Sequence, residues 1–156
     1  MVNAIAILQS ATAVIGTVYF TQKGGSSTTI HANITGAPPG LHGMHVHQYG
    51  DLSNGCESMG AHFNPYNQTH GGPHDSVKHA GDFGNVQVDD SGHAYFTLTV
   101  DSLTFEGPDS IIGRGIIFHS GQDDLGRGNE TSKIAGNSGA RLACGVIGIP
   151  NPNTTG

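Results

Sequence analysis

The sequence predicts an all-β protein, an antiparallel sandwich or barrel built from eight short strands. Polar and apolar residues alternate with period two in several segments, as they do in half-buried strands. The 25 glycines follow no Gly-X-Y period, so they indicate turns between short elements rather than a fibrous chain. No window shows a convincing helical period with caps. The length fits one domain, which we expect to span residues 1–156.

Alternation is clearest in residues 30–34 and 95–100. In both segments the even-numbered positions are apolar and the odd-numbered ones are mostly polar, so one face of each strand should be buried. The other segments are rich in β-forming residues and are bounded by turn residues. These six further predicted strands are residues 2–8, 14–21, 41–47, 82–88, 115–119 and 142–149.

Two long intervals, residues 48–81 and 120–140, interrupt this rhythm. Both are rich in Gly, Asn and Ser and poor in apolar residues. Long loops without secondary structure are uncommon in compact domains unless a function or a cross-link orders them. The side chains within these two loops should therefore supply their order. The polar tail, residues 150–156, is expected to fray.

The net charge of −6 argues against nucleic acid and anionic membranes as partners, because both reward clustered Lys and Arg. No apolar run reaches the length of a membrane-spanning helix, and the first residues lack the features of a signal peptide. We expect a cytoplasmic protein, with the mature form of a secreted protein as the alternative. The glycosylation sequons at Asn33, Asn67, Asn129 and Asn153 would matter only in the secreted case.

His45 and His47 form the first candidate metal-binding pair among ten histidines. They lie two residues apart on a predicted strand, so both side chains leave the same face. Met44 and Val46 then point into the core.

Further candidate ligands cluster at the two long loops: His62, His70, His79, Asp82 and His119. Imidazole and carboxylate groups suit copper and zinc, and two distant cysteines cannot form a thiolate zinc site. Six histidines and one aspartate are one ligand short of two separate four-coordinate sites. One imidazole would therefore have to bind both metals, one through each ring nitrogen.

A single histidine on a strand is usually a surface residue or a hydrogen-bonded one. We keep that interpretation for His31, His74 and His93, and expect His42 to hold the backbone before the metal-binding strand. For the other six histidines, the pairing and the loop positions favour metal binding.

Several motifs resemble the copper/zinc superoxide dismutases over essentially the whole chain. They are GMHVHQYGD at residues 43–51, GAHFNP at 60–65, HGGP at 70–73, HAGD at 79–82, DDLG at 123–126 and GARLACGVIG at 139–148. The resemblance implies an eight-stranded antiparallel Greek-key β-barrel, an immunoglobulin-like sandwich with two long functional loops. It also implies one copper and one zinc ion per subunit, and the disproportionation of superoxide to oxygen and hydrogen peroxide.

The same resemblance assigns roles to individual residues. Copper would be held by His45, His47, His62 and His119. Zinc would be held by His62, His70, His79 and Asp82. His62 would be the shared imidazolate and would carry a proton during catalysis. Asp123 would hydrogen-bond one ligand histidine of each metal, although on sequence alone it could be a solvated loop acid.

Cys56 and Cys144 match the internal disulfide of the family, whereas reduced cysteines are the ordinary state in the cytosol. Arg141 matches the arginine that guides the anion to copper; otherwise it would be an ordinary surface residue. Lys133 is a candidate for additional steering. The chain departs from the family at Ile134 and Ala135, where hydroxyl residues are common at the rim of the channel.

The resemblance also implies a homodimer through the apolar residues Ile5, Ile7, Ile112 and Ile149, for which core packing is the competing explanation. A copper chaperone would be a further partner. Two alternative functions are a copper-chaperone domain of the same fold and a metal-storage protein. The first would lack copper ligands or Arg141, and the second would need no anion-guiding arginine.

Overall fold

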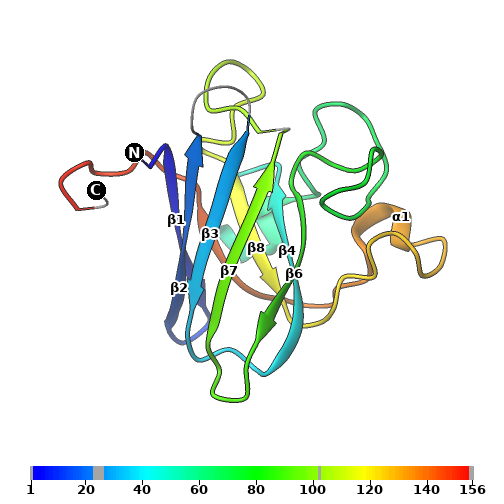
Figure 1. Ribbon diagram of the computed structural model, residues 1–156, viewed down its shortest axis with the longest axis horizontal. Helices are drawn as coiled ribbons and strands as arrows, with labels where there is room; N and C mark the ends of the chain where they lie inside the picture. The colour runs from blue at the N-terminus through cyan, green and yellow to red at the C-terminus, as the bar shows by residue number, and fades with distance from the viewer. Residues whose placement is uncertain (1, 23–26, 102, 155–156) are drawn as a thin grey trace.

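The computed structural model describes residues 2–22, 27–101 and 103–154. Its main element is one eight-stranded antiparallel sheet, rolled into a nearly closed barrel (Figure 1). The strands of this sheet are β1 (Ala4–Ser10), β2 (Val14–Gln22), β3 (Thr28–Ile34), β4 (Gly40–His47), β6 (Asp82–Val88), β7 (Ala94–Val100), β8 (Gly115–His119) and β9 (Arg141–Val146). The loops contain β5 (Ser53–Cys56), the 3-10 helix η1 (Glu57–Met59) and the short helix α1 (Ser132–Ala135). The predicted fold class is confirmed.

The strand order is β6-β4-β8-β9-β1-β2-β3-β7. β3 and β4 follow one another in the sequence but lie far apart in this order, and so do β7 and β8. Their connections therefore cross between strands that are not neighbours, as in a Greek key. β6 and β7 are in contact where the barrel nearly closes.

Strand β4 places the metal candidates outside the barrel. Met44 and Val46 are fully buried in the core, as expected, while His45 and His47 point to the opposite face. That outer face is nevertheless buried, because the long loops cover it. The candidate ligands therefore lie between the outer surface of the barrel and the long loops that cover it.

A second, smaller apolar cluster attaches the first long loop to the barrel. Met59 of η1 packs on the outer face of β8 and β9, against Ile117 and Cys144. Gly115 makes this possible, because a Cβ atom there would collide with the Met59 sulfur. β8 is thus buried on both faces along its whole length.

The predicted strand ends differ most from the observed ones at β9, while β1 is shifted by two residues from the predicted range of 2–8. β9 ends at Val146 rather than at residue 149, because Ile147 turns to pair with another segment. Its N–H donates to the Arg114 carbonyl (2.8 Å), and its carbonyl accepts from the Gly113 N–H (2.7 Å). The short helix α1 was not predicted either, since four residues carry no periodic signal.

Figure 1 shows α1 and the loop that precedes β6 on one side of the barrel, with both chain termini on the other. Among the described residues, no helix is long and apolar enough to cross a membrane.

Candidate metal centre

Four histidines converge above the outer face of β4, and we call them the four-histidine group: His45, His47, His62 and His119. One ligand atom from each lies within 4.8 Å of all the others, and all four residues are buried. β4 and the end of β8 supply three of them. His62 comes from the first long loop, which is bridged to β4 at His47 and bonded there through the Phe63 N–H to the Val46 carbonyl (2.8 Å).

The ring nitrogens of this group divide into bonded and unbonded ones. His45 Nε2 donates to Asp123 Oδ2 (2.7 Å), and His47 Nδ1 donates to the Gly60 carbonyl (2.8 Å). His119 Nδ1 faces the Gly139 carbonyl at 3.2 Å. In each ring the opposite nitrogen is buried and has no partner, as is His62 Nε2. A neutral imidazole that donates through one nitrogen offers a lone pair at the other, which is the state that binds a metal.

A second set surrounds the carboxylate of Asp82, and we call it the aspartate group: His62, His70, His79 and Asp82. Asp82 Oδ1 lies 3.0 Å from His62 Nδ1, 2.9 Å from His70 Nδ1 and 3.5 Å from His79 Nδ1. His62 Nδ1 and His79 Nδ1 are 3.1 Å apart.

These spacings fit a metal better than hydrogen bonds. Four ligands at zinc distances of about 2.0–2.1 Å in a tetrahedron are separated from one another by about 3.3 Å. A single Nδ1 proton cannot bond several neighbours at once, whereas one cation can accept a lone pair from each. His45 also lies within 4.8 Å of His62, His70 and Asp82, but its Nε2 is committed to Asp123 and its free Nδ1 belongs to the four-histidine group.

His62 is common to both groups. Its Nδ1 faces Asp82, and its unpartnered Nε2 belongs to the four-histidine group. The structure therefore places the two nitrogens of one ring toward two different sites, the arrangement that the ligand count required.

Burial keeps most of these imidazoles neutral. It lowers the pKa of His45 to about 3 and of His119 to about 4, and also lowers the pKa values of His47 and His62. His70 differs: burial lowers its pKa, but hydrogen bonds to Asp123 and Asp82 outweigh burial and raise it to about 9. The space between the two carboxylates therefore favours a positive charge.

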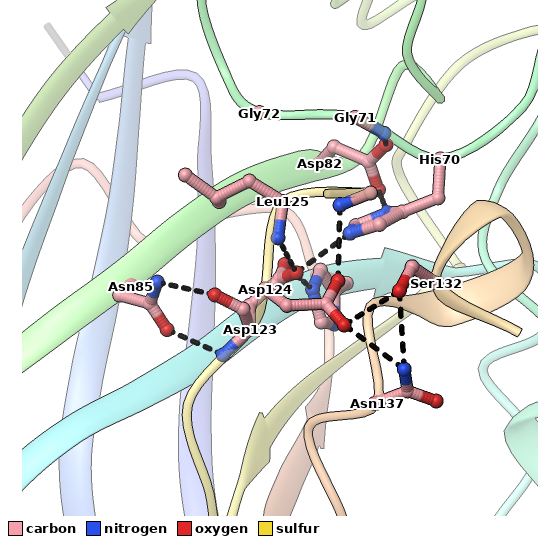
Figure 2. A network of polar contacts seen from close by, with 12 residues as sticks. His70, Gly71, Gly72, Asp82, Asn85, Asp123, Asp124, Leu125, Ser132 and Asn137 are labelled. Atoms are coloured by element: carbon pink, nitrogen blue, oxygen red, sulfur yellow. Dashed lines mark hydrogen bonds and ion pairs between the residues drawn. The ribbon is translucent and has the colours of Figure 1, made fainter. Parts of the chain in front are cut away.

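Asp123 connects the two groups through the two oxygens of its carboxylate (Figure 2). Oδ2 accepts from His45 and Oδ1 accepts from His70 Nε2, both at 2.7 Å. Burial would raise the pKa of Asp123, but these two hydrogen bonds lower it to about 2. Asn85 on β6 fixes its main chain, since the Asp123 N–H donates to Asn85 Oδ1 (2.7 Å) and Asn85 Nδ2 donates to the Asp123 carbonyl (2.9 Å). Such bonds orient ligand rings.

Asp124 organises the second long loop, also seen in Figure 2. Its Oδ2 accepts from the buried Ser132 hydroxyl (2.6 Å) and from Asn137 Nδ2 (2.9 Å). The Asp124 N–H donates to the Gly136 carbonyl (2.9 Å). Gly136 adopts φ of 77°, and a Cβ atom there would collide with Asp123 Oδ1. α1 is thereby attached to Asp124, the residue that follows the aspartate orienting both groups.

A cavity of about 480 Å³ opens onto the four-histidine group. Its lining includes His47, His62, His119 and Arg141, and also Ile134 and Ala135. None of His70, His79 and Asp82 lines this cavity. The four-histidine group is thus the one that a dissolved molecule reaches through the cavity.

Arg141 is held in place by the first long loop. One guanidinium nitrogen donates to the Cys56 carbonyl and the other donates to the Gly60 carbonyl, each at 2.9 Å. The Gly60 carbonyl also accepts from His47, so the arginine and a metal candidate share one anchor. Lys133 does not line the cavity; it lies near enough to Asp75 to help lower the pKa of that carboxyl, after the bonds from Gly72 and Arg127.

The disulfide between Cys56 and Cys144 is confirmed, with Cα atoms 5.9 Å apart. It ties the first long loop to β9, three residues beyond Arg141. His42 also fulfils its expected role, because its ring contacts the carbonyls of Pro38 (2.7 Å) and His119 (2.8 Å).

Sequence reasoning missed the residues that position the loops, namely Asn85, Asp124, Ser132, Asn137 and Arg114. Arg114 lies 4.0 Å from the centre of the Phe63 ring and donates to three backbone carbonyls, those of Gln48, Pro108 and Ser110. No local sequence pattern predicts contacts between residues so far apart in the chain. The adjacent Asp123 and Asp124 were the one usable signal.

Comparisons with known proteins agree with this geometry. The family model described as copper/zinc superoxide dismutase matches residues 14–147. A solved crystal structure of a protein described as the clock protein EA4 shares 44% sequence identity and a TM-score of 0.90. The match covers 95% of this chain and 94% of that one.

Proposed function

We propose, from the premise that this chain belongs to the copper/zinc superoxide dismutase family, that its two ligand groups hold one copper and one zinc ion in each subunit. The chain is a superoxide dismutase, an oxidoreductase that converts two superoxide anions and two protons into oxygen and hydrogen peroxide. The set of buried, unpartnered ring nitrogens is the observation that carries the assignment of the ligands.

Copper is assigned to the four-histidine group and zinc to the aspartate group. Imidazole ligands suit both metals, but His47, His62 and His119 of the four-histidine group line the cavity that substrate enters, whereas His70, His79 and Asp82 do not. The mixed nitrogen and oxygen set around Asp82 is enclosed, as structural zinc sites are. When bound, copper supplies a one-electron redox couple that one superoxide reduces and a second reoxidises, which zinc cannot do.

The residues of the chain bind the anion and manage its protons. Arg141 lines the same cavity as His47 and His119, and its positive charge attracts an anion toward these histidines. His62 Nε2 is the buried nitrogen placed to hold a proton beside the bound anion, while Nδ1 stays directed to the aspartate group. A proton from His62 and one from solvent complete hydrogen peroxide. Asp123 keeps the rings of His45 and His70 in their orientations throughout.

The decisive experiment is a superoxide assay on protein loaded with copper and zinc, alongside protein loaded with zinc alone. We expect rapid dismutation only when copper is present. A metal-storage protein would take up the same ions without turnover, and a chaperone domain would release copper to an acceptor. Full metal loading without dismutation would contradict the ligand assignment.

The proposed homodimer uses an exposed apolar surface at the two ends of the chain. Ile7 is 44% exposed and Ile149 is 82% exposed, while Ile5 and Ile112 are half-buried beside them. Ile5 pairs with Gly148, which brings the two ends together. Sedimentation of Ile7→Glu tests the surface: the variant should be monomeric where the wild type is dimeric.

Three further proposals rest on the sequence. Residues 1–156 form one domain, the protein works in the cytoplasm, and a copper chaperone delivers its copper. The disulfide fits a secreted protein equally well, so cell fractionation of the native protein decides the location. Lys133 stays a predicted contributor to steering from outside the cavity.

A further inference from the structure

An exposed isoleucine lies at the mouth of the cavity that leads to the four-histidine group. Ile134 is 69% exposed and lines this cavity together with Ala135. Arg141 lines it too, and is the only Lys, Arg, Asp or Glu residue in the described lining. The lining therefore combines one cationic side chain with two neighbouring apolar ones, beside the polar residues Thr131, Asn137 and Ser138.

Ile134 and Ala135 belong to a segment, residues 132–137, that hydrogen bonds hold in place. Ser132 and Asn137, at its two ends, both donate to Asp124 (Figure 2). Between them, the Lys133 carbonyl accepts from the His70 N–H (2.8 Å), which ties the segment to the first long loop. These hydrogen bonds hold the backbone of the segment in place, so Ile134 stays exposed at the entrance of the cavity.

Arg141 has donors to spare. An arginine carries five N–H groups, and two of them bond to the carbonyls of Cys56 and Gly60. The side chain is 21% exposed, and Glu57, its nearest acid, is 3.9 Å away and mostly in solvent. The remaining N–H groups can bind a carboxylate.

We propose that this mouth binds a small amphipathic monocarboxylate. The carboxylate would bond to Arg141 and the aliphatic tail would cover Ile134 and Ala135. A cavity of about 480 Å³ lies within the range of roughly 300–1,000 Å³ common for small-molecule sites. A small inorganic anion would use only Arg141, and a neutral alkane only Ile134 and Ala135. A bound monocarboxylate would exclude superoxide, so it would act as a competitive inhibitor.

The test compares the sodium salts of acetate, butyrate and hexanoate at constant ionic strength. Dissociation constants are measured by methyl NMR on the metal-loaded protein with copper reduced, and therefore diamagnetic. Full burial of a methylene is worth about fourfold in affinity, and half burial about twofold. Hexanoate should therefore bind at least about tenfold more tightly than acetate, and its binding should shift the Ile134 methyl signals.

Variants of Ile134 test whether its side chain contacts the aliphatic tail, and an uncharged ligand tests the contribution of the carboxylate. Ile134→Asn should reduce the preference for hexanoate over acetate to less than about threefold, while Ile134→Leu should retain it. Val14→Asn is the matched control, because Val14 is similarly exposed (60%) and does not line this cavity. Hexanol, which has the tail without the charge, should bind about tenfold more weakly than hexanoate to the wild type.

Three results would overturn the proposal. One is equal affinity for acetate and hexanoate, and a second is an unchanged preference in Ile134→Asn. The third is a shift confined to Leu52 and Leu142, which line a separate cavity that also touches Arg141. Binding is read without turnover, so failure here leaves the dismutase assignment intact. An inactive protein that still prefers hexanoate would leave this inference intact.

Discussion

Ser132→Ala should loosen the segment that forms the mouth of the metal cavity without disturbing the barrel. The Ser132 hydroxyl is fully buried and donates to Asp124 Oδ2 at 2.6 Å. It also accepts from the N–H groups of Gly128 (3.1 Å) and Asn129 (2.7 Å). Alanine removes these three bonds, together with the longer contacts to Asn137 Nδ2 (3.2 Å) and Asn129 Oδ1 (3.4 Å), and adds no new contact.

The bond to Asp124 sets the size of the effect. Gly128 and Asn129 are exposed, so water can replace the hydroxyl as their acceptor. Asp124 is half-buried and its partner hydroxyl is fully buried, so water replaces this bond less readily. A hydrogen bond to a charged group contributes about 1.5–3 kcal/mol. A loss of about 2 kcal/mol corresponds to a roughly 30-fold increase in local opening, at about 1.4 kcal/mol per tenfold.

Amide hydrogen exchange by mass spectrometry measures this opening. Peptides covering residues 122–138 should exchange about 30-fold faster in Ser132→Ala, while peptides from β1 to β3 should not change. Ser91→Ala is the matched control, because the Ser91 hydroxyl bonds to Asp89 in an exposed turn (2.7 Å) and should cost little. Unchanged exchange in residues 122–138 would refute the role assigned to the Asp124 contacts.

Other variants test the metal groups and the cross-link. His119→Ala should lose copper and dismutase activity but keep zinc and the fold, as metal analysis and circular dichroism would show; unfolding of the zinc-loaded variant would count against the assignment. Asp82→Ala should lower the melting temperature of the metal-loaded protein, because a metal bound only to the folded state adds its binding energy to stability, and an unchanged value would contradict this. Arg141→Ile should slow the reaction with superoxide while both metals stay bound, and Arg141→Glu should slow it further and weaken or invert its salt dependence; equal rates in pulse radiolysis would move the guiding role elsewhere. Reduction of Cys56–Cys144, which spans 88 residues, should destabilise the protein by at most about 4–5 kcal/mol in the chain-entropy model, as chemical denaturation would measure, and no change would argue against that role.

The sequence predicted the features that depend on local periodicity. His45 and His47 alternate with two core residues, and this pattern alone places them together on the outer face of β4. The ligand count similarly required one shared imidazole, which His62 now matches geometrically. The pairing of Cys56 with Cys144 came only from the family resemblance, because neither spacing nor composition selects it.

The loops were beyond sequence reasoning because distant residues order them. Ser132 and Asn137 order the second loop because both donate to Asp124. Asp123 is held in position partly by Asn85, which lies on β6. Lys133 illustrates the consequence. The family resemblance put Ile134 and Ala135 at the rim of the channel and offered Lys133 only as a candidate for steering; the structure has both rim residues in the cavity lining, and Lys133 does not line it.

Anomalous X-ray scattering at the copper and zinc absorption edges, from crystals of the metal-loaded protein, tests the central claim most directly. We predict two separate peaks with the His62 ring between them. Copper should lie among His45, His47 and His119, and zinc beside Asp82. A single metal peak, copper beside Asp82, or a His62 ring that contacts only one ion would contradict it.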